Sequence, residues 1–168
     1  LCKMKLYHIS PYPMLTVLIP KKPSNHIVEL GLEDGVTKRV SLAPTIMDCV
    51  RGVSDNQIGA VYYVYEAMGL NTKYIVYPTQ RQVPDVSHTH EVWYTKPVAV
   101  RKIGAIKLLG ATKFKYVELD SEKHGKVNFP VHYFKYKKIK PGPDEYEFNR
   151  LGKIKNAIYE KIAKFYGK

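Results

Sequence analysis

Three short stretches of the chain hold polar side chains whose types suit ligand binding or catalysis. The first is His8-Ile9-Ser10, where an imidazole and a hydroxyl at a strand end can face one polar ligand. The second runs from Arg39 to Thr45, a strand entering a helix N-terminus whose free amides suit an anion. The third starts at Glu91, whose carboxylate can accept a hydrogen bond from a ribose hydroxyl and stabilise the cation formed when a glycosidic bond breaks.

Each stretch also has an ordinary structural interpretation. A single strand-end histidine is more often structural than catalytic, and Glu91 is equally compatible with an exposed strand edge. His88 and His90 beside Glu91 raise the alternative of a metal site, but two histidines in a polar loop are usually unligated. The two cysteines, Cys2 and Cys49, lack CxxC spacing and fit a reducing compartment, so we predict no metal site.

Short β-strands are expected to position these residues. Thr45 is expected to cap a short helix, with Asp48 three residues later as an approximate capping box. The polar, irregular segment Pro78–His90 is a loop of the kind that often carries function. Alternation and composition predict strands over Lys5–His8, Leu15–Ile19, Lys38–Leu42, Ala60–Ala67, Lys73–Tyr77, Glu91–Thr95 and Val98–Leu109.

The last third of the chain differs from the first two thirds in its charge and in its expected elements. A hairpin is predicted from Tyr116 to Lys138, turning near His124-Gly125, and Lys140-Pro141-Gly142-Pro143 ends it. Apolar residues then recur at helical spacing from Phe148 to Phe165, which indicates an amphipathic C-terminal helix. We therefore predict one α+β domain over 1–168, with a core over 1–110 and a basic hairpin and helix over 111–168.

The formal net charge of +12 is the strongest compositional signal. A domain this basic attracts phosphates, nucleic acid or an acidic protein surface, although a solvated basic face without a dedicated partner is the alternative. The apolar runs are too short to span a bilayer, and the first residues lack the apolar core of a signal peptide. These features predict a soluble, cytoplasmic protein without a membrane partner.

Taken in order, these pieces resemble the ADP-ribosyltransferase superfamily, particularly rifampin ADP-ribosyltransferase and the RNA 2′-phosphotransferases. The resemblance covers roughly Leu6 to Leu108 and implies a split antiparallel β core with short helices. The stretches that carry it are Tyr7-His8, Val17-Leu18-Ile19-Pro20, Val40 to Thr45, Val64-Tyr65-Glu66-Ala67, Glu91 to Pro97 and Val100 to Ile106.

The resemblance implies that NAD is bound and that ADP-ribose is transferred to a protein or nucleic-acid acceptor. It gives catalytic roles to Glu91 and His8, with Glu91 acting on the ribose that is attacked. It places NAD against His8, Ile9, Ser10, Ser41, Leu42 and Thr45. Ile9 stands where many members have glycine, and the ring that stacks on nicotinamide would come from Tyr12, Tyr63 or Tyr94.

The alternative is a non-enzymatic basic binding module on the same scaffold, for nucleic acid or, as a phage-type effector, for an acidic host protein. A tyrosine-rich sheet can stack bases while lysines hold phosphates. The expected platform consists of Tyr62, Tyr63, Tyr65, Tyr133, Phe134 and Tyr136. These residues also fit half-buried strands with surface hydroxyls. The residues specify neither the acceptor nor the oligomeric state.

Overall fold

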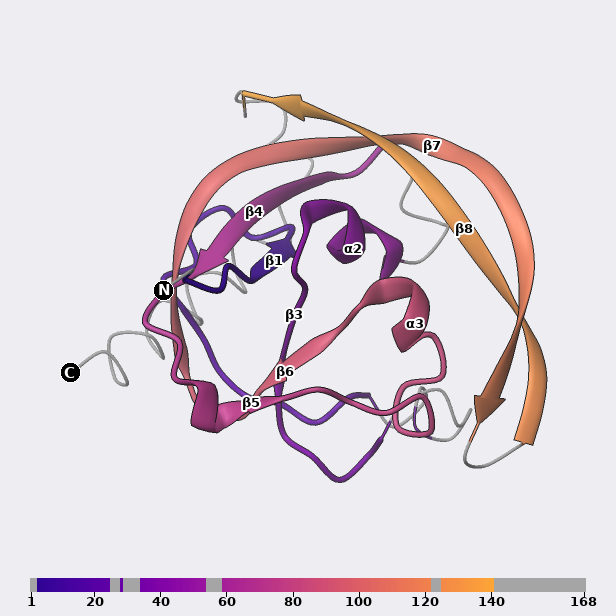
Figure 1. The fold of residues 1–168 in the computed structure, drawn as a ribbon. Coiled ribbons are helices and arrows are strands. Elements are labelled where there is room, and N and C mark those ends of the chain that lie inside the picture. Colours follow the sequence, from indigo (N-terminus) through magenta and orange to yellow (C-terminus); the bar gives the residue numbers. More distant parts are fainter. Residues whose placement is uncertain (1–2, 25–27, 29–33, 54–58, 122–124, 141–168) are drawn as a thin grey trace.

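Antiparallel strands form most of the regular structure in the computed structural model, which describes residues 3–24, 28, 34–53, 59–121 and 125–140 (Figure 1). Short helices interrupt them: α2 (Ile46–Arg51), the 3-10 helix η2 (Thr72–Tyr74) and α3 (Val86–Thr89). The strands are β1 (Tyr7–Ser10), β2 (Val17–Leu18), β3 (Val40–Leu42), β4 (Val61–Ala67), β5 (Ile75–Val76), β6 (Val92–Tyr94), β7 (Val98–Ser121) and β8 (Gly125–Ile139).

The strands form two antiparallel sheets. The larger has the order β1-β4-β7-β2, with β8 added on β7, and the smaller has the order β3-β6-β5. The expectation of an α+β fold with antiparallel strands and short helices is confirmed. The predicted C-terminal helix lies outside the described residues, and in the described part of the chain no helix is long and apolar enough to cross a membrane.

The apolar core joins the two sheets. Tyr63 and Tyr65 of β4 are fully buried and belong to one cluster with Leu42 of β3 and Val92 of β6. A second cluster lies under α2 and consists of Val50, Val64, Ile106, Leu108 and Phe134. The expected aromatic platform is therefore wrong in part, because Tyr63, Tyr65 and Phe134 are core residues and cannot stack bases.

The strands β1 and β3 connect the two sheets at a single β-bridge. Tyr7 and Ala43 exchange both backbone hydrogen bonds, with N···O distances of 2.8 and 2.9 Å. A second bridge, between Lys21 and Arg39, ties the other end of β3 to the segment after β2. The strand β3 is thus held at both ends. Between these ends, its middle residue Ser41 and residues of β1 line cavities between the sheets.

Two expectations about the second half of the chain are wrong, one about a strand and one about a loop. The strand after Val98 does not end at Leu109 but continues to Ser121 and pairs with β8 in one long hairpin, here called the β7–β8 ribbon. Gly110, with φ of 148°, lies where the register shifts, so this glycine forms a bulge and does not terminate the strand. In addition, the segment Pro78–His90, predicted to be an irregular loop, contains the helix α3.

Candidate functional site in the cleft between the two sheets

Glu91 is placed by the junction between α3 and β6. His90 ends α3 in the left-handed conformation, with φ of 51° and ψ of 34°, and its amide donates to Val86 O over 2.8 Å. Few residues other than glycine adopt this conformation readily, and it turns the chain sharply out of the helix. As a result Glu91 lies directly before β6, the central strand of the smaller sheet.

The carboxylate of Glu91 is held by two donors that share one face of the sheet. Ser41 and Trp93 are register partners across β3 and β6, and Glu91 lies two residues before Trp93. Cross-strand partners and i, i+2 neighbours point to the same side of a sheet. Ser41 Oγ donates to Glu91 Oε1 over 2.6 Å and Trp93 Nε1 donates to the same oxygen over 2.8 Å. In the described part of the chain, Oε2 has no hydrogen-bond donor and is available to a ligand.

Trp93 is fixed from its other side. Its side chain is fully buried, and the guanidinium carbon of Arg39 lies 4.3 Å from the ring centroid. Arg39 is itself buried and donates to the carbonyl oxygens of Asp34 and Thr37. Both groups that position Glu91 therefore belong to rigid strands, which is what a preorganised carboxylate requires.

His8 lies on the adjacent strand β1 and is joined to the same residue of β3. Its Nδ1 donates to the carbonyl oxygen of Ser41 over 3.0 Å. A carbonyl can only accept, so Nδ1 carries the proton. Burial lowers the pKa of His8, although the hydrogen bond to Ser41 opposes this effect. The imidazole is therefore neutral near pH 7, and its Nε2 is a hydrogen-bond acceptor.

His8 and Ser41 stand between two cavities, each of about 250 Å³, that together form one cleft. The first cavity, here called the basic lobe, also has Lys21, Lys22 and Arg39 in its wall. The second, here called the acidic lobe, has Glu91 and Asp48 in its wall. The cleft thus presents cations on one side of the His8–Ser41 contact and carboxylates on the other, and its size is in the range of small-molecule sites.

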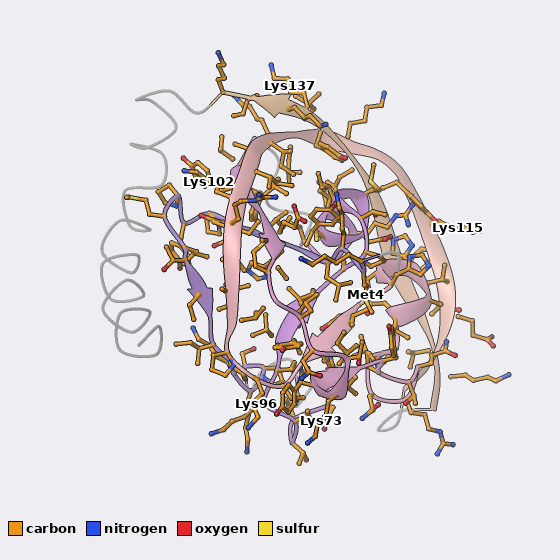
Figure 2. The ribbon with its side chains drawn as sticks, turned by 60° about the vertical axis from the view of Figure 1, so that its left-hand side comes forward. Met4, Lys73, Lys96, Lys102, Lys115 and Lys137 are labelled. Atoms are coloured by element: carbon orange, nitrogen blue, oxygen red, sulfur yellow. The ribbon has the colours of Figure 1, made fainter. Side chains whose placement is uncertain are left out.

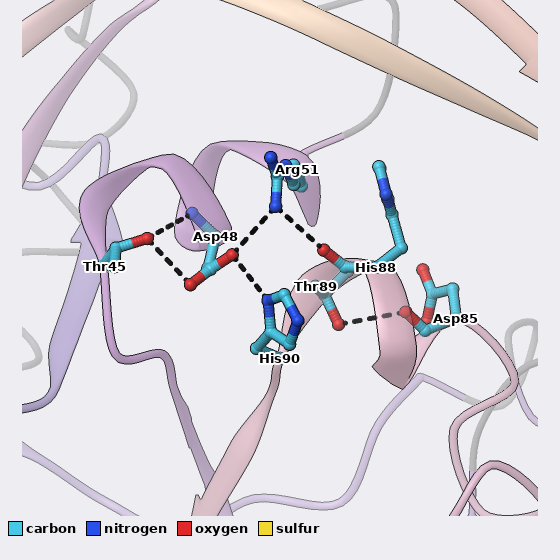
Figure 3. Close-up of polar contacts among 7 residues, drawn as sticks. All are labelled: Thr45, Asp48, Arg51, Asp85, His88, Thr89 and His90. Atoms are coloured by element: carbon cyan, nitrogen blue, oxygen red, sulfur yellow. Dashed lines mark hydrogen bonds and ion pairs between the residues drawn. The ribbon is translucent and has the colours of Figure 1, made fainter.

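Asp48 connects α2 to the end of α3 (Figure 3). Its buried carboxylate accepts hydrogen bonds from Thr45 Oγ1 at 2.7 Å, His90 Nδ1 at 2.8 Å and Arg51 at 3.1 Å. Burial alone would raise the pKa of Asp48, but the hydrogen bonds from His90 and Thr45 and the charges of His90 and Arg51 lower it below its usual range. We call this group, Thr45, Asp48, Arg51 and His90, the Asp48 clamp.

Asp85 is a third carboxyl group near the site, after Glu91 and Asp48. Burial and, next, the negative charge of Glu91 raise the pKa of Asp85 to about 6. It stands at the N-cap position of α3 but makes no capping hydrogen bond with its side chain. Strongly shifted carboxyl groups are common at functional sites. Nothing in the local sequence distinguishes this aspartate, so sequence reasoning missed it.

Most of the predicted site residues come together in the cleft. His8, Ser41 and Glu91 all line the acidic lobe, together with Ile9 and Leu42, while Ser10 is buried in the wall of the basic lobe. Thr45 lines neither lobe, because its hydroxyl is used by the Asp48 clamp and by the cap of α2 at Asp48 N. The predicted NAD contact at Thr45 is therefore not supported.

The candidate rings for stacking on nicotinamide differ in burial. Tyr63 and Tyr94 are core residues, and Tyr12 lies in the basic lobe. Tyr62, which was not predicted for this role, lines the acidic lobe. Lys21 and Lys22 were also missed, since two lysines in a proline-flanked loop carry no motif. Their place in the cleft depends on the Lys21–Arg39 bridge.

The alternative metal site is not formed. His88 packs edge-on against Tyr133, with ring centroids 5.1 Å apart, whereas His90 binds Asp48 and Glu91 binds Ser41 and Trp93. The three side chains therefore have separate surroundings. Among the described residues, no group of three or more histidine, cysteine or acidic side chains is arranged to hold a metal ion.

No protein-family model, no curated protein and no solved structure matches this chain. The geometry and chemistry of the cleft are therefore the features that bear on its function.

Proposed function

We propose that the chain binds NAD in the cleft between the two sheets and transfers ADP-ribose from it to an acceptor. The observation that supports this proposal is the hydrogen-bonded series His8–Ser41–Glu91 at a common cavity, formed by residues 33 and 50 positions apart. The core consists of two sheets, and β1 of one sheet and β3 of the other meet at one bridge and line the cleft. This arrangement agrees with an ADP-ribosyltransferase-like split core.

The charges of the two lobes match the two halves of NAD. The pyrophosphate is anionic, and Lys21, Lys22 and Arg39 surround the basic lobe. The nicotinamide ring is cationic, and the acidic lobe holds Glu91 and Asp48. Between them, the neutral His8 accepts a hydrogen bond at Nε2, which suits a ribose hydroxyl.

In the proposed reaction the bond between the nicotinamide nitrogen and the ribose breaks, and nicotinamide leaves with the electron pair. The sugar becomes oxocarbenium-like, the acceptor attacks the same carbon, and the acceptor loses its proton. Glu91 accepts a hydrogen bond from the ribose hydroxyl at Oε2 and stabilises the positive charge. Ser41 and Trp93 keep the carboxylate in place while this charge develops.

The two departures from the family pattern have local explanations. Ile9 lines the acidic lobe, where family members commonly have glycine, so it supplies apolar contact in place of close backbone approach. Tyr62 lines the same lobe and supplies the ring that Ser41-Leu42 lacks. Tyr62→Ala is therefore expected to weaken NAD binding.

The first prediction concerns Glu91. With the intact chain, NAD should raise the melting temperature and release nicotinamide, with water as acceptor if no other is present. Glu91→Gln should retain the thermal shift and lose about 100-fold or more of the nicotinamide release, since removal of one preorganised electrostatic group typically costs that much.

The matched control is Glu66→Gln, which makes the same substitution at the half-buried glutamate that pairs with Arg101 on β7. This variant should release nicotinamide at the unaltered rate. The proposal fails if NAD gives neither a thermal shift nor nicotinamide, or if both variants lose activity equally.

A further inference from the structure

The β7–β8 ribbon carries much of the positive charge of the described chain. It pairs residues from Ala105↔Ile139 to Ser121↔Gly125 and curves around α2 and α3 (Figure 1). The strand β8 has no acidic residue, and its lysines are Lys126, Lys135, Lys137 and Lys138. The long lysine side chains of the ribbon, such as Lys115 and Lys137, project outward (Figure 2).

The positive charge is not neutralised at the base of the ribbon, which is the end far from the turn, from Ala105↔Ile139 to Gly110↔Lys135. Lys107 and Lys137 are directly opposite each other in the register, and like charges in this position destabilise a sheet. Of the ribbon lysines, Lys126 forms an ion pair with Glu118 at 3.4 Å near the tip. In the described part of the chain, Lys107, Lys135, Lys137 and Lys138 form no ion pair. A bound polyanion would relieve their mutual repulsion.

The composition of the ribbon favours nucleic acid over an acidic protein. Lysine is depleted in protein–protein interfaces, whose centres are apolar, whereas it is the usual contact to phosphate backbones. Lys115 is exposed and the next residue, Tyr116, is 62% exposed, so the ribbon carries a cation and an aromatic ring on its two faces. A two-stranded ribbon also has the width that a duplex groove admits.

The base of the ribbon adjoins the cleft. Phe134 of β8 packs with Val50 of α2, and the neighbouring residues Cys49, Gly52 and Val53 line the acidic lobe. Lys135 and Lys137 alternate with Phe134 and Tyr136, which pack on this core, so the two lysines lie on the outer face of the ribbon, away from α2.

We infer that the β7–β8 ribbon binds the phosphate backbone of a nucleic acid through Lys107, Lys135 and Lys137, which share its outer face. This surface lies outside the cleft, and binding to it does not require NAD. The inference therefore goes beyond the proposed transferase activity.

The second prediction tests this surface with Lys135→Gln/Lys137→Gln in the full chain. Fluorescence anisotropy with a labelled single-stranded RNA and a labelled duplex DNA of equal length, each at several salt concentrations, gives the affinity and the salt slope. The double variant should bind about tenfold more weakly, and its slope of log affinity against log salt should be shallower by about 1.5.

The matched control is Lys73→Gln/Lys96→Gln, which removes the same charge from two exposed lysines at the opposite end of the molecule (Figure 2). It should bind almost as the unaltered chain does. Preference for the RNA or for the duplex identifies the form of nucleic acid.

Equal weakening by the two double variants would overturn the inference, because net charge alone would then explain the binding. Binding of polyglutamate as tight as that of the nucleic acids at equal salt would also overturn it, in favour of an acidic protein partner. The NAD thermal shift should be the same in both double variants, so a failure here is distinct from a failure of the cleft.

Discussion

At the scale of single residues, Glu91 is distinguished by what surrounds its two oxygens. Oε1 accepts from a hydroxyl and an indole nitrogen that belong to two paired strands, and Oε2 has no protein donor among the described residues. A carboxylate held in this way loses little entropy when a ligand arrives, which is the benefit of preorganisation. The nearby Asp85 responds to the same charge.

The third prediction concerns Asp85. Its pKa is raised from 3.8 to about 6, so the folded chain binds more protons than the unfolded chain between these values. The contribution of Asp85 to the free energy of unfolding therefore falls as pH rises from about 4 to 6. Asp85→Asn should remove this loss and raise the stability by about 1 to 2 kcal/mol at pH 7, with little effect at pH 4. Urea unfolding at the two pH values measures the difference, and an equal effect at both would contradict it.

Residue types and chain order were sufficient to select His8, Ser41 and Glu91, because each stands at the end or middle of a short strand that alternation predicts. Asp48 and Asp85 could not be given their roles in this way. The partners of Asp48 come from α2 and from His90, 42 positions later, and the shifted pKa of Asp85 depends on burial. Both are tertiary properties that no local spacing encodes.

At the scale of elements, α3 and α2 act as a pair. The helices are short, so neither is stable alone, and the Asp48 clamp joins them. The clamp ends at His90, whose left-handed backbone leads directly to Glu91. The predicted Thr45 cap is confirmed, with Thr45 Oγ1 accepting from Asp48 N over 3.1 Å. Helix α3 was missed because four residues are too few to show a helical period.

The fourth prediction separates two properties of His90, its hydrogen bond to Asp48 and its left-handed backbone. His90→Ala removes the hydrogen bond to Asp48 and leaves a residue with a Cβ at φ of 51°, so it should cost about 1 to 2 kcal/mol. His90→Gly removes the same hydrogen bond but adopts this conformation freely, and it should be more stable than His90→Ala by about 1 kcal/mol. Urea denaturation of the two variants gives this difference. Glycine that is no better than alanine would show that the backbone there is unstrained.

At the scale of the whole molecule, the net charge of +12 opposes folding as well as attracting partners. Self-repulsion of this size destabilises a folded chain, and the Lys107–Lys137 pair is one local instance of it. The charge also gives the molecule two basic regions with different geometry, a concave lobe around Lys21 and Arg39 and the outer face of the ribbon.

The fifth prediction is that the melting temperature rises with sodium chloride from about 20 to 300 mM, since the Debye length shortens over this range. The expected gain is several degrees, as about 1 kcal/mol shifts a domain of this size by a few degrees. Lys135→Gln/Lys137→Gln should melt higher than the unaltered chain at low salt and gain less from added salt. A melting temperature that is constant or falls with salt would show that repulsion among the positive charges contributes little to the stability of the fold.

The position of Trp93 has a practical consequence. It is the single tryptophan of the chain, and its indole touches the carboxylate that would meet a ligand. Tryptophan emission therefore arises next to Glu91, which lines the acidic lobe, so occupancy of this lobe can be followed by fluorescence without attaching a dye.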